Sequence, residues 1–315
     1  MTMAPVVLVT GADGFVGRHI VAALNQAGWH VRLAQRSPAP QCSNIDVVTG
    51  FDLGPSTDWQ PALNGVQAVV HLAARAHRSI RIQQREEELY FSINVDGTMQ
   101  LARNAADAGV RNFIFLSSVA VNGSVSDGRP PFSERDKIAP TTVYGRSKAA
   151  AEAELAKLAS RRSMAVTAVR APMIYGGGAG GNFHRLTFAV HKGIPLPFSM
   201  IHNRRAFLGV ENLSSFIAYR LSTEISSDFD VLLLADDQQV STPRFIRELA
   251  HASARIPRLF PIPTPMLRIP LRYLGLSDAL LGSLEIDTAK ARATGWKCPL
   301  TLSEGLARAV APSQR

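Results

Sequence analysis

The sequence predicts an α/β protein built on a doubly wound parallel sheet, with a smaller lobe formed by its C-terminal part. Three observations lead to this fold class. Short apolar runs alternate with helical patterns through the first half of the chain, as in successive βαβ units. The runs are continuously apolar, which is typical of strands buried on both faces of a parallel sheet. A glycine-rich turn joins the first run to the first helix.

Each predicted strand is a short apolar run bounded by turn residues. Between the first two runs, Val16, Ile20 and Ala23 recur at helical spacing, which predicts a helix over Phe15–Ala27 with Gly28 as its C-terminal cap. The predicted strands are Val6–Thr10, His30–Ala34, Asp46–Thr49, Ala68–Leu72, Phe113–Ser117, Val166–Arg170 and, in the second half, Asp230–Leu234.

The pattern of elements changes after Arg170. Ala171–Gly181 contains Pro172 and five glycines, so we expect a loop or crossover there rather than a helix. Short proline-punctuated pieces follow. We therefore expect a first domain at residues 1–170, joined by a returning strand from about 206–235, and a smaller lobe over most of residues 171–315.

The composition suits a folded chain with a sizeable core and an acidic partner. The chain has 315 residues, of which 46% are hydrophobic, and a formal net charge of +9. Such a charge attracts nucleic acid, a membrane surface or a polyphosphorylated small molecule. The arginines are scattered, without a run of five or six like charges, so we do not expect a nucleic-acid partner.

We expect no disulfide framework, no metal site and no membrane-spanning segment. Cys42 and Cys298 lie far apart, and the eight histidines are dispersed, so there is neither a disulfide framework nor metal-ligand spacing. The apolar start at Pro5–Val9 lacks a basic region and leads directly into glycines, which favours a strand over a signal peptide. No apolar stretch is long enough to cross a bilayer. We therefore predict a cytoplasmic protein.

The turn after the first strand has three glycines at a spacing of three, Gly11, Gly14 and Gly17, and opens the first helix. Glycine at these positions permits a tight turn and a close backbone approach to a pyrophosphate, and the helix N-terminus supplies N–H donors. The alternative is a tight turn without a ligand. The strand–loop–helix context favours a dinucleotide-binding Rossmann domain.

The end of the second strand indicates which dinucleotide is bound. An NAD site usually has an acidic residue there, which accepts hydrogen bonds from the ribose hydroxyls. Here Gln35 occupies that position and Arg36 follows, and a guanidinium group is suited to a 2′-phosphate. We therefore predict NADP(H) as the preferred cofactor, with NAD(H) possible. Asp52 and Leu53, after the third strand, are candidates for an adenine contact.

Tyr144 and Lys148 are four residues apart at the start of a predicted helix, so the phenol and the ammonium group share one face. A nearby positive charge is expected to lower the pKa of the tyrosine from its usual value near 10. Ser117 and Ser118 end the predicted fifth strand, at the sheet edge where ligands bind in open α/β folds. Capping of the following turn is the alternative role of Ser118.

These motifs resemble those of extended short-chain dehydrogenases, the NAD-dependent epimerase/dehydratase family, over nearly the whole chain. They occur in the family's order: the glycine turn, His71–Ala74, Asn94–Thr98, Ser118 and the Tyr144/Lys148 pair. The family includes UDP-sugar epimerases, dehydratases and keto-sugar reductases. The resemblance implies Ser118, Tyr144 and Lys148 as catalytic residues. It implies cofactor contacts at Gly11, Asp13, Gly14, Phe15, Val16, Gly17, Arg36, Asp52, Leu53, Leu72, Ala73, Ala74, Asn94, Ser117, Tyr144, Lys148 and Pro172.

The same resemblance implies that the C-terminal lobe binds a UDP-sugar and that the protein is a homodimer. Arg205 matches the arginine that grips the nucleotide diphosphate, with Arg204 as the fallback. Asn182 and Phe183 match a substrate-binding segment, Phe198 matches the strand lining the uracil, and Ser118 also contacts the sugar. Packing in the core is the alternative role of the two phenylalanines.

The choice of reaction depends on departures from the family patterns. Val119–Ala120 replaces the acidic pair of dehydratases, and Gln35, Met173 and Leu280–Gly282 depart from UDP-hexose epimerases. The sequence resembles bacterial reductases of UDP-4-keto-6-deoxy-N-acetylhexosamines, which act in surface polysaccharide synthesis. We therefore favour a ketoreductase in which Tyr144 donates the proton. A 4-epimerase with retained NAD is the alternative, and a redox-silent dinucleotide-binding protein is a third.

Overall fold

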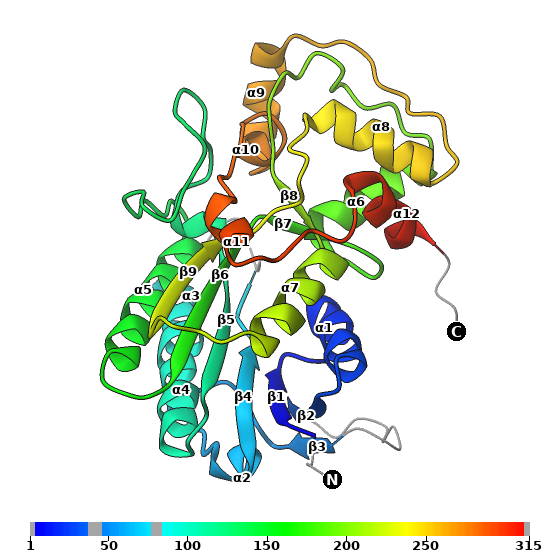
Figure 1. The fold of residues 1–315 in the computed structure, drawn as a ribbon. Coiled ribbons are helices and arrows are strands. Elements are labelled where there is room, and N and C mark those ends of the chain that lie inside the picture. Colours follow the sequence, from blue (N-terminus) through cyan, green and yellow to red (C-terminus); the bar gives the residue numbers. More distant parts are fainter. Residues whose placement is uncertain (1–3, 37–45, 77–83, 312–315) are drawn as a thin grey trace. The chain divides into compact units, whose positions relative to one another are not determined.

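The computed structural model describes residues 4–36, 46–76 and 84–311 (Figure 1). The chain forms two compact units. The first comprises Met1–Val121, Ile138–Arg170 and Ser214–Leu232. The second comprises Asn122–Lys137, Ala171–Leu213 and Leu233–Arg315.

The first unit is built on a seven-stranded sheet with the order β3-β2-β1-β4-β5-β6-β9. The pairs β1–β2, β1–β4, β2–β3 and β4–β5 are parallel. This is the predicted doubly wound fold, and every predicted strand is present within two residues of its predicted ends. The strands are β1 (Val6–Thr10), β2 (His30–Gln35), β3 (Asp46–Thr49), β4 (Val66–His71), β5 (Asn112–Ser118), β6 (Ala165–Ala171) and β9 (Phe229–Leu233).

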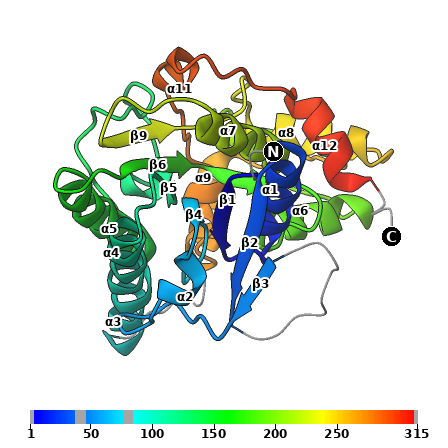
Figure 2. The same cartoon turned by 60° about the horizontal axis from the view of Figure 1, so that its bottom comes forward.

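Helices lie on both faces of this sheet, with α1 and α7 on one face and α3, α4 and α5 on the other (Figures 1 and 2). Aliphatic and aromatic side chains of β5, such as Phe113 and Phe115, are fully buried and share one core with Leu101 and Leu155 of the helices. The helices of this unit are α1 (Phe15–Gln26), α2 (Gln60–Leu63), α3 (Gln84–Phe91), α4 (Thr98–Asp107), α5 (Val143–Ala159) and α7 (Val210–Ser222), whose first residues belong to the second unit.

Two short irregular helices lie beside α5. A π-helical turn, η1 (Ser92–Gly97), connects α3 to α4, and a 3₁₀ turn, η2 (Val119–Val121), follows β5. π-Helical turns are rare and are frequent at functional sites. Here the π-helical turn contains Asn94, and the 3₁₀ turn directly follows Ser118.

The second unit contains a small parallel sheet of β7 (Met173–Tyr175) and β8 (Phe207–Gly209). A loop or crossover was predicted for Ala171–Gly181, and Met173–Tyr175 of this segment form the short strand β7. The unit's core is aromatic, because the rings of Tyr175, Phe183 and Phe207 pack around Phe245. Its helices are α6 (Gly181–His191), α8 (Thr242–Ala252), α9 (Thr264–Tyr273), α10 (Ser277–Leu280), α11 (Ala289–Ala293) and α12 (Leu302–Val310).

A buried carboxylate connects the strands and loops of the second unit. Asp236 accepts hydrogen bonds from the Tyr175 hydroxyl at 2.7 Å, the Gly209 amide at 2.9 Å and the Asn212 amide group at 2.7 Å. Asn212 in turn exchanges two hydrogen bonds with the backbone of Leu300. This network fixes β7, β8 and the segment before α12 to one another.

No helix in the described ranges is long and apolar enough to span a membrane. Within the same ranges, no group of three histidine, cysteine, aspartate or glutamate side chains is arranged to hold a metal ion. Cys298 is a free thiol, and Cys42 lies outside the described residues.

Candidate active site

The candidate site begins at the carboxyl edge of the first unit's sheet, between β1 and β4. The strand order reverses between these two neighbours, and ligands of open α/β sheets bind at such a switch point. Gly11 directly follows β1, Leu72 directly follows β4, and Ser118 ends the adjacent strand β5.

The glycine turn is packed against both of its neighbours. Gly11 has a φ of +70°, and a Cβ atom there would lie 2.8 Å from the backbone nitrogen of Ala73. A Cβ atom on Gly17 would collide with the carbonyl oxygen of Gly11. The turn therefore lies directly against the segment after β4, and helix α1 starts at a distance that only glycine allows.

The N-terminus of α1 is suited to a bound phosphate. Gly14 is the N-cap residue, no side chain caps the helix, and its first turn contains no acidic residue. The N-terminal amides and the positive end of the helix dipole are therefore not neutralised by the protein itself. Asp13 is exposed, and Phe15 and Val16 are half-buried. This arrangement fits the pyrophosphate of a dinucleotide.

The end of β2 offers a hydrogen-bond acceptor. The side-chain oxygen of Gln35 is buried and has no hydrogen-bond partner within the described structure, which is unfavourable unless a ligand donates to it. A ribose hydroxyl group is such a donor, so Gln35 fits a cofactor although it is not acidic. Arg36 is exposed at the next position. Asp52 accepts a hydrogen bond from the Leu53 amide, and Leu53 packs against Gly97.

His71, at the end of β4, crosslinks this edge of the sheet. Its ring nitrogens hydrogen-bond to the hydroxyl groups of Thr10 at 2.7 Å and Thr98 at 2.9 Å. Burial, together with the positive charge of Lys148, lowers the pKa of His71 to about 3, so the ring is neutral at physiological pH. The role of His71 is therefore to hold β1 and β4 to helix α4. Its position in the sequence motif did not reveal these partners.

Asn94 occupies the π-helical turn and is buried. Its side chain accepts a hydrogen bond from the Arg75 amide at 2.7 Å and donates to the Arg75 carbonyl oxygen and to the Ser147 hydroxyl. Asn94 was predicted to contact the cofactor. In the structure its amide group holds the segment after β4, where Ala73 and Ala74 are half-buried, against helix α5.

Tyr144 and Lys148 lie in the first turns of α5, which Thr142 caps by accepting a hydrogen bond from the Gly145 amide. The Lys148 ammonium group donates to the carbonyl oxygen of Leu116 at 2.9 Å. It lies 4.3 Å from the ring centre of Phe115 and 5.9 Å from that of Tyr144. The two predicted catalytic side chains are therefore adjacent, and the lysine is anchored to β5.

The pKa values of this pair differ from the sequence-based expectation. Burial, with a contribution from Tyr90, raises the pKa of Tyr144 to about 12, so the prediction of a lowered pKa was wrong for this structure. The reason is that the buried phenol has lost the solvent that would stabilise its phenolate. Burial also lowers the pKa of Lys148 to about 7, against the opposing effect of Glu152.

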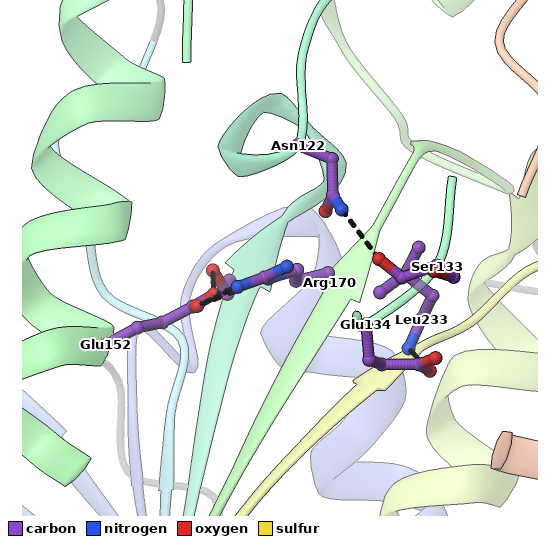
Figure 3. A network of polar contacts seen from close by, with 7 residues as sticks. Asn122, Ser133, Glu134, Glu152, Arg170 and Leu233 are labelled. Atoms are coloured by element: carbon purple, nitrogen blue, oxygen red, sulfur yellow. Dashed lines mark hydrogen bonds and ion pairs between the residues drawn. The ribbon is translucent and has the colours of Figure 1, made fainter. Parts of the chain in front are cut away.

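Glu152 forms a buried network one helical turn after Lys148 (Figure 3). Its carboxylate accepts hydrogen bonds from the Arg170 guanidinium group of β6, the shortest at 2.6 Å, and from the Ser117 hydroxyl at 2.5 Å. The side chains of both charged partners are 4% exposed. Ser117 was predicted as a cofactor contact, and in the structure it donates to this carboxylate.

Ser118 is half-buried and directly follows Ser117. Its hydroxyl oxygen accepts a hydrogen bond from the Ala120 amide at 3.2 Å, which caps the 3₁₀ turn. This is the alternative role considered for Ser118 in the sequence. A hydroxyl group has one donor hydrogen and two acceptor lone pairs, so the cap leaves its O–H available as a donor.

The second unit contains the predicted substrate arginine. Arg205 is 8% exposed, and its Nη1 atom donates to the carbonyl oxygens of Asp278 at 2.7 Å and Gly282 at 2.6 Å. Burial lowers the pKa of Arg205 to about 10. Arg204 is largely exposed and pairs with Glu285. Through Nη1, Arg205 therefore holds α10 and the residues that follow it against its own segment.

The other predicted substrate residues of this unit differ in exposure. Phe183 and Phe198 are 4% and 7% exposed, and Phe183 packs against Tyr175, as their alternative role in the core requires. Asn182 is exposed, and Pro172 is buried between β6 and β7. In the same unit, Asn122 donates to the Ser133 carbonyl oxygen, and Glu134 accepts from the Leu233 amide (Figure 3).

Sequence reasoning missed Glu152 and the structural roles of Arg170 and His71. Glu152 could have been found from its spacing, because it follows Lys148 by four residues and therefore lies on the same helix face. Its partner Arg170 was recognised only as the end of a strand. The pairing depends on β6 lying beside β5, which is a tertiary relationship.

Comparison with known proteins identifies the family. The NAD dependent epimerase/dehydratase family matches residues 7–227. The chain belongs to this family. The resemblance to extended short-chain dehydrogenases is thereby confirmed.

Three known proteins are similar to this chain over nearly its whole length. A UDP-glucose 4-epimerase of Vibrio cholerae is 37% identical over 305 residues, which cover 95% of this chain and 92% of that protein. An N-acetyl-alpha-D-glucosaminyl-diphospho-ditrans,octacis-undecaprenol 4-epimerase of Escherichia coli O157:H7 is 27% identical over 326 residues, covering 96% and 94%. A solved structure of MoeE5 in complex with UDP-glucuronic acid and NAD has a TM-score of 0.77 and 26% identity, covering 96% of this chain and 97% of that one.

Proposed function

We propose that this protein is a UDP-hexose 4-epimerase that works with a retained NAD. The observation that carries the proposal is the Tyr144/Lys148 pair at the head of α5, whose lysine donates to β5 two residues before Ser118. The chain that holds this pair is 37% identical to a UDP-glucose 4-epimerase over nearly its whole length. The sequence alone favoured a ketoreductase. The similarity to 4-epimerases supports its alternative better.

The absence of an acidic residue at the end of β2 is compatible with this function. Gln35 has a buried oxygen without a partner in the described structure, and this oxygen can accept a hydrogen bond from a ribose hydroxyl without a carboxylate. The residues that would hold the cofactor are the glycine turn at its pyrophosphate, Gln35 at its adenosine ribose, and Lys148 near its nicotinamide ribose. The relative MoeE5 was solved with NAD, which supports the same cofactor here.

Epimerisation at carbon 4 needs one proton and one hydride to leave the sugar and return, with the hydride returning to the other face. The nicotinamide, when bound, supplies the hydride acceptor and donor. Tyr144 would take the proton of the 4-hydroxyl group and give it back, while the Ser118 O–H donates to the same oxygen. Tyr144 would be a phenolate before it takes this proton and again after it returns it, and a positive charge on Lys148 would stabilise that phenolate.

We propose that the second unit contributes the nucleotide contacts. Arg205 uses Nη1 for two backbone carbonyl oxygens, and a guanidinium group has five N–H donors in all. The remaining donors are suited to a diphosphate. Asn182, which is exposed at the start of α6, and Phe183 would bind the substrate backbone, and Phe198 would line its base.

The test is to incubate the purified protein with UDP-glucose, without added cofactor, and to follow the sugar by NMR. We expect interconversion of UDP-glucose and UDP-galactose with no net change in absorbance of reduced nicotinamide. The same experiment with UDP-GlcNAc reports on the N-acetylated pair. Failure of both interconversions, with the cofactor shown to be bound, would overturn the proposal.

A 4-ketoreductase is the second candidate, because exposed Arg36 beside Gln35 is suited to the 2′-phosphate of NADPH. It is tested with UDP-4-keto-6-deoxy-GlcNAc and each reduced cofactor. A ketoreductase should consume NADPH in preference to NADH, and Arg36→Ala should remove that preference. Equal losses for both cofactors would exclude a phosphate contact at Arg36.

A further inference from the structure

A stretch of the second unit carries positive charge without any acidic residue. Between Glu248 and Asp278 the sequence contains neither aspartate nor glutamate. The same stretch contains four exposed arginines, Arg255, Arg258, Arg268 and Arg272. Its local charge is therefore strongly positive, and opposite charges outside this protein are its natural complement.

Helix α9 within this stretch has three different faces. Leu267 and Leu271, four residues apart, are buried at 6% and 8% exposure and attach the helix to the unit. Arg268 and Arg272 form a second stripe, and both are exposed. The third face is apolar and contains Met266, Ile269 and Tyr273, at spacings of three and four residues.

The apolar face is open to solvent. Met266 and Ile269 are each 68% exposed, and Tyr273 is 84% exposed. Leu274, at the end of the helix, is 57% exposed. Met200, whose carbonyl oxygen accepts a hydrogen bond from the Thr264 hydroxyl group, is 42% exposed. Single exposed apolar residues are ordinary, but a contiguous row beside basic residues is typical of an interaction site.

We propose that helix α9 docks on an anionic membrane surface, with Met266, Ile269 and Tyr273 in the headgroup region and Arg268 and Arg272 on acidic phosphates. Helices that lie in a bilayer interface combine such an apolar face with a basic one. A ten-residue helix is only about 15 Å long, so α9 lies along the surface and does not cross it. None of these residues belongs to the proposed catalytic machinery.

Charge decides between a membrane and a second copy of the chain. Two copies that joined face to face through α9 would bring Arg268 and Arg272 of both copies together, with no acidic residue in the stretch to compensate them. Anionic lipids, by contrast, neutralise the arginines while the acyl boundary receives the apolar side chains.

The experiment is co-sedimentation of the full chain with sonicated vesicles of phosphatidylcholine alone or mixed equally with phosphatidylglycerol. We expect binding to the mixed vesicles, which weakens as salt is raised, and little binding to the neutral ones. Arg268→Gln/Arg272→Gln should weaken binding by about 25-fold, since each basic residue contributes roughly fivefold near such a surface. Met266→Ser/Ile269→Ser/Tyr273→Ser should weaken it by about tenfold or more.

Matched controls keep the proposal falsifiable. Leu89→Ser/Ile138→Ser removes apolar side chains of the first unit that are 41% and 45% exposed, and Arg161→Gln/Arg162→Gln removes an exposed basic pair there. Both controls should bind vesicles as the wild type does, and circular dichroism and thermal melting verify that all variants are folded. Equal binding to neutral vesicles, no binding to anionic ones, or equal losses in the controls would each overturn the proposal. So would a wild-type dimer, seen by ultracentrifugation, that only the α9 variants dissociate.

Discussion

Glu152 lies one helical turn after Lys148 on α5 and opposes the fall in the pKa of that lysine, while its own carboxylate is held by Arg170. A buried carboxylate at this position therefore does two things. It neutralises the guanidinium group of β6, and it favours the charged form of the lysine beside Tyr144.

Glu152→Gln should lower the pKa of Lys148 further, because it removes the negative charge that raises it. Activity that needs the ammonium form is lost as the pH rises through this pKa, so the alkaline limb of the turnover profile should move to lower pH. The measurement is turnover against pH, with wild type and variant compared at saturating substrate.

A double variant separates the change in the pKa of Lys148 from the loss of stability that Glu152→Gln also causes. Glu152→Gln alone leaves the Arg170 charge buried without its partner, which typically costs about 3–5 kcal/mol. Glu152→Gln/Arg170→Met removes both charges, so it should regain stability yet keep the shifted profile. Ser117→Ala keeps both charges and should keep the wild-type profile. A double variant with the wild-type profile would reduce Glu152 to a structural role.

Lys148→Met should change how stability depends on pH. The pKa of Lys148 falls from 10.5, the ordinary value for lysine, to about 7 in the folded chain, so the unfolded state binds this proton more tightly. The resulting loss of stability is fully present below pH 7 and disappears as the pH rises toward 10.5. Between these limits the wild type should gain stability relative to the variant, by up to about 1.4 kcal/mol per pH unit.

Urea unfolding of both proteins at pH 7, 8, 9 and 10 measures this difference. Lys157→Met is the matched control, because this side chain of the same helix is 66% exposed. The control should follow the wild type at every pH. A difference between Lys148→Met and the wild type that does not change with pH would mean that the lysine is not desolvated in the folded protein.

Tyr144→Phe removes one hydroxyl group and keeps the ring, so the fold should survive. If Tyr144 transfers the proton, turnover should fall by about 10²- to 10⁴-fold with little change in the Michaelis constant. Tyr90→Phe is the control, since it removes a neighbouring buried phenol without touching the proposed proton path. A near-native rate for Tyr144→Phe would assign the proton transfer to another group.

Arg205→Ala should affect both stability and substrate binding. Loss of the two bonds to Asp278 and Gly282 should lower the free energy of unfolding by about 2 kcal/mol or more. If the guanidinium group also binds the diphosphate, the Michaelis constant should rise, because such a contact persists from ground state to transition state. Arg204→Ala, on an exposed side chain, should change both quantities less. A lower melting temperature with an unchanged Michaelis constant would leave Arg205 a purely structural role.

Much of the first unit could be predicted from the sequence, because its signals are local. Strands buried on both faces need continuous apolar runs, and a glycine turn between β1 and α1 needs residues such as Gly11 and Gly17. The Tyr144/Lys148 pair follows from helical spacing alone. Strand β7 was missed because its three residues stand among a proline and several glycines, and its pairing with β8 is long-range.

The burial of site side chains and the identity of their interaction partners could not be predicted from such local signals. The raised pKa of Tyr144 depends on how completely α5 and its neighbours exclude water from the phenol. The Glu152–Arg170 pair and the bridge from His71 to Thr10 and Thr98 depend on which strands are adjacent. Spacing along one element shows which side chains share a face, but the partner comes from another element.

The π-helical turn Ser92–Gly97 makes the number of residues in this part of the chain as important as their identity. An α-helix advances about 100° per residue, so deleting one residue here would rotate α4 relative to α3 by roughly that angle. Asn94 would then turn away from Ser147, or the apolar face of α4 would turn away from the sheet. Relatives that share this core should therefore tolerate substitutions in the turn far better than insertions or deletions.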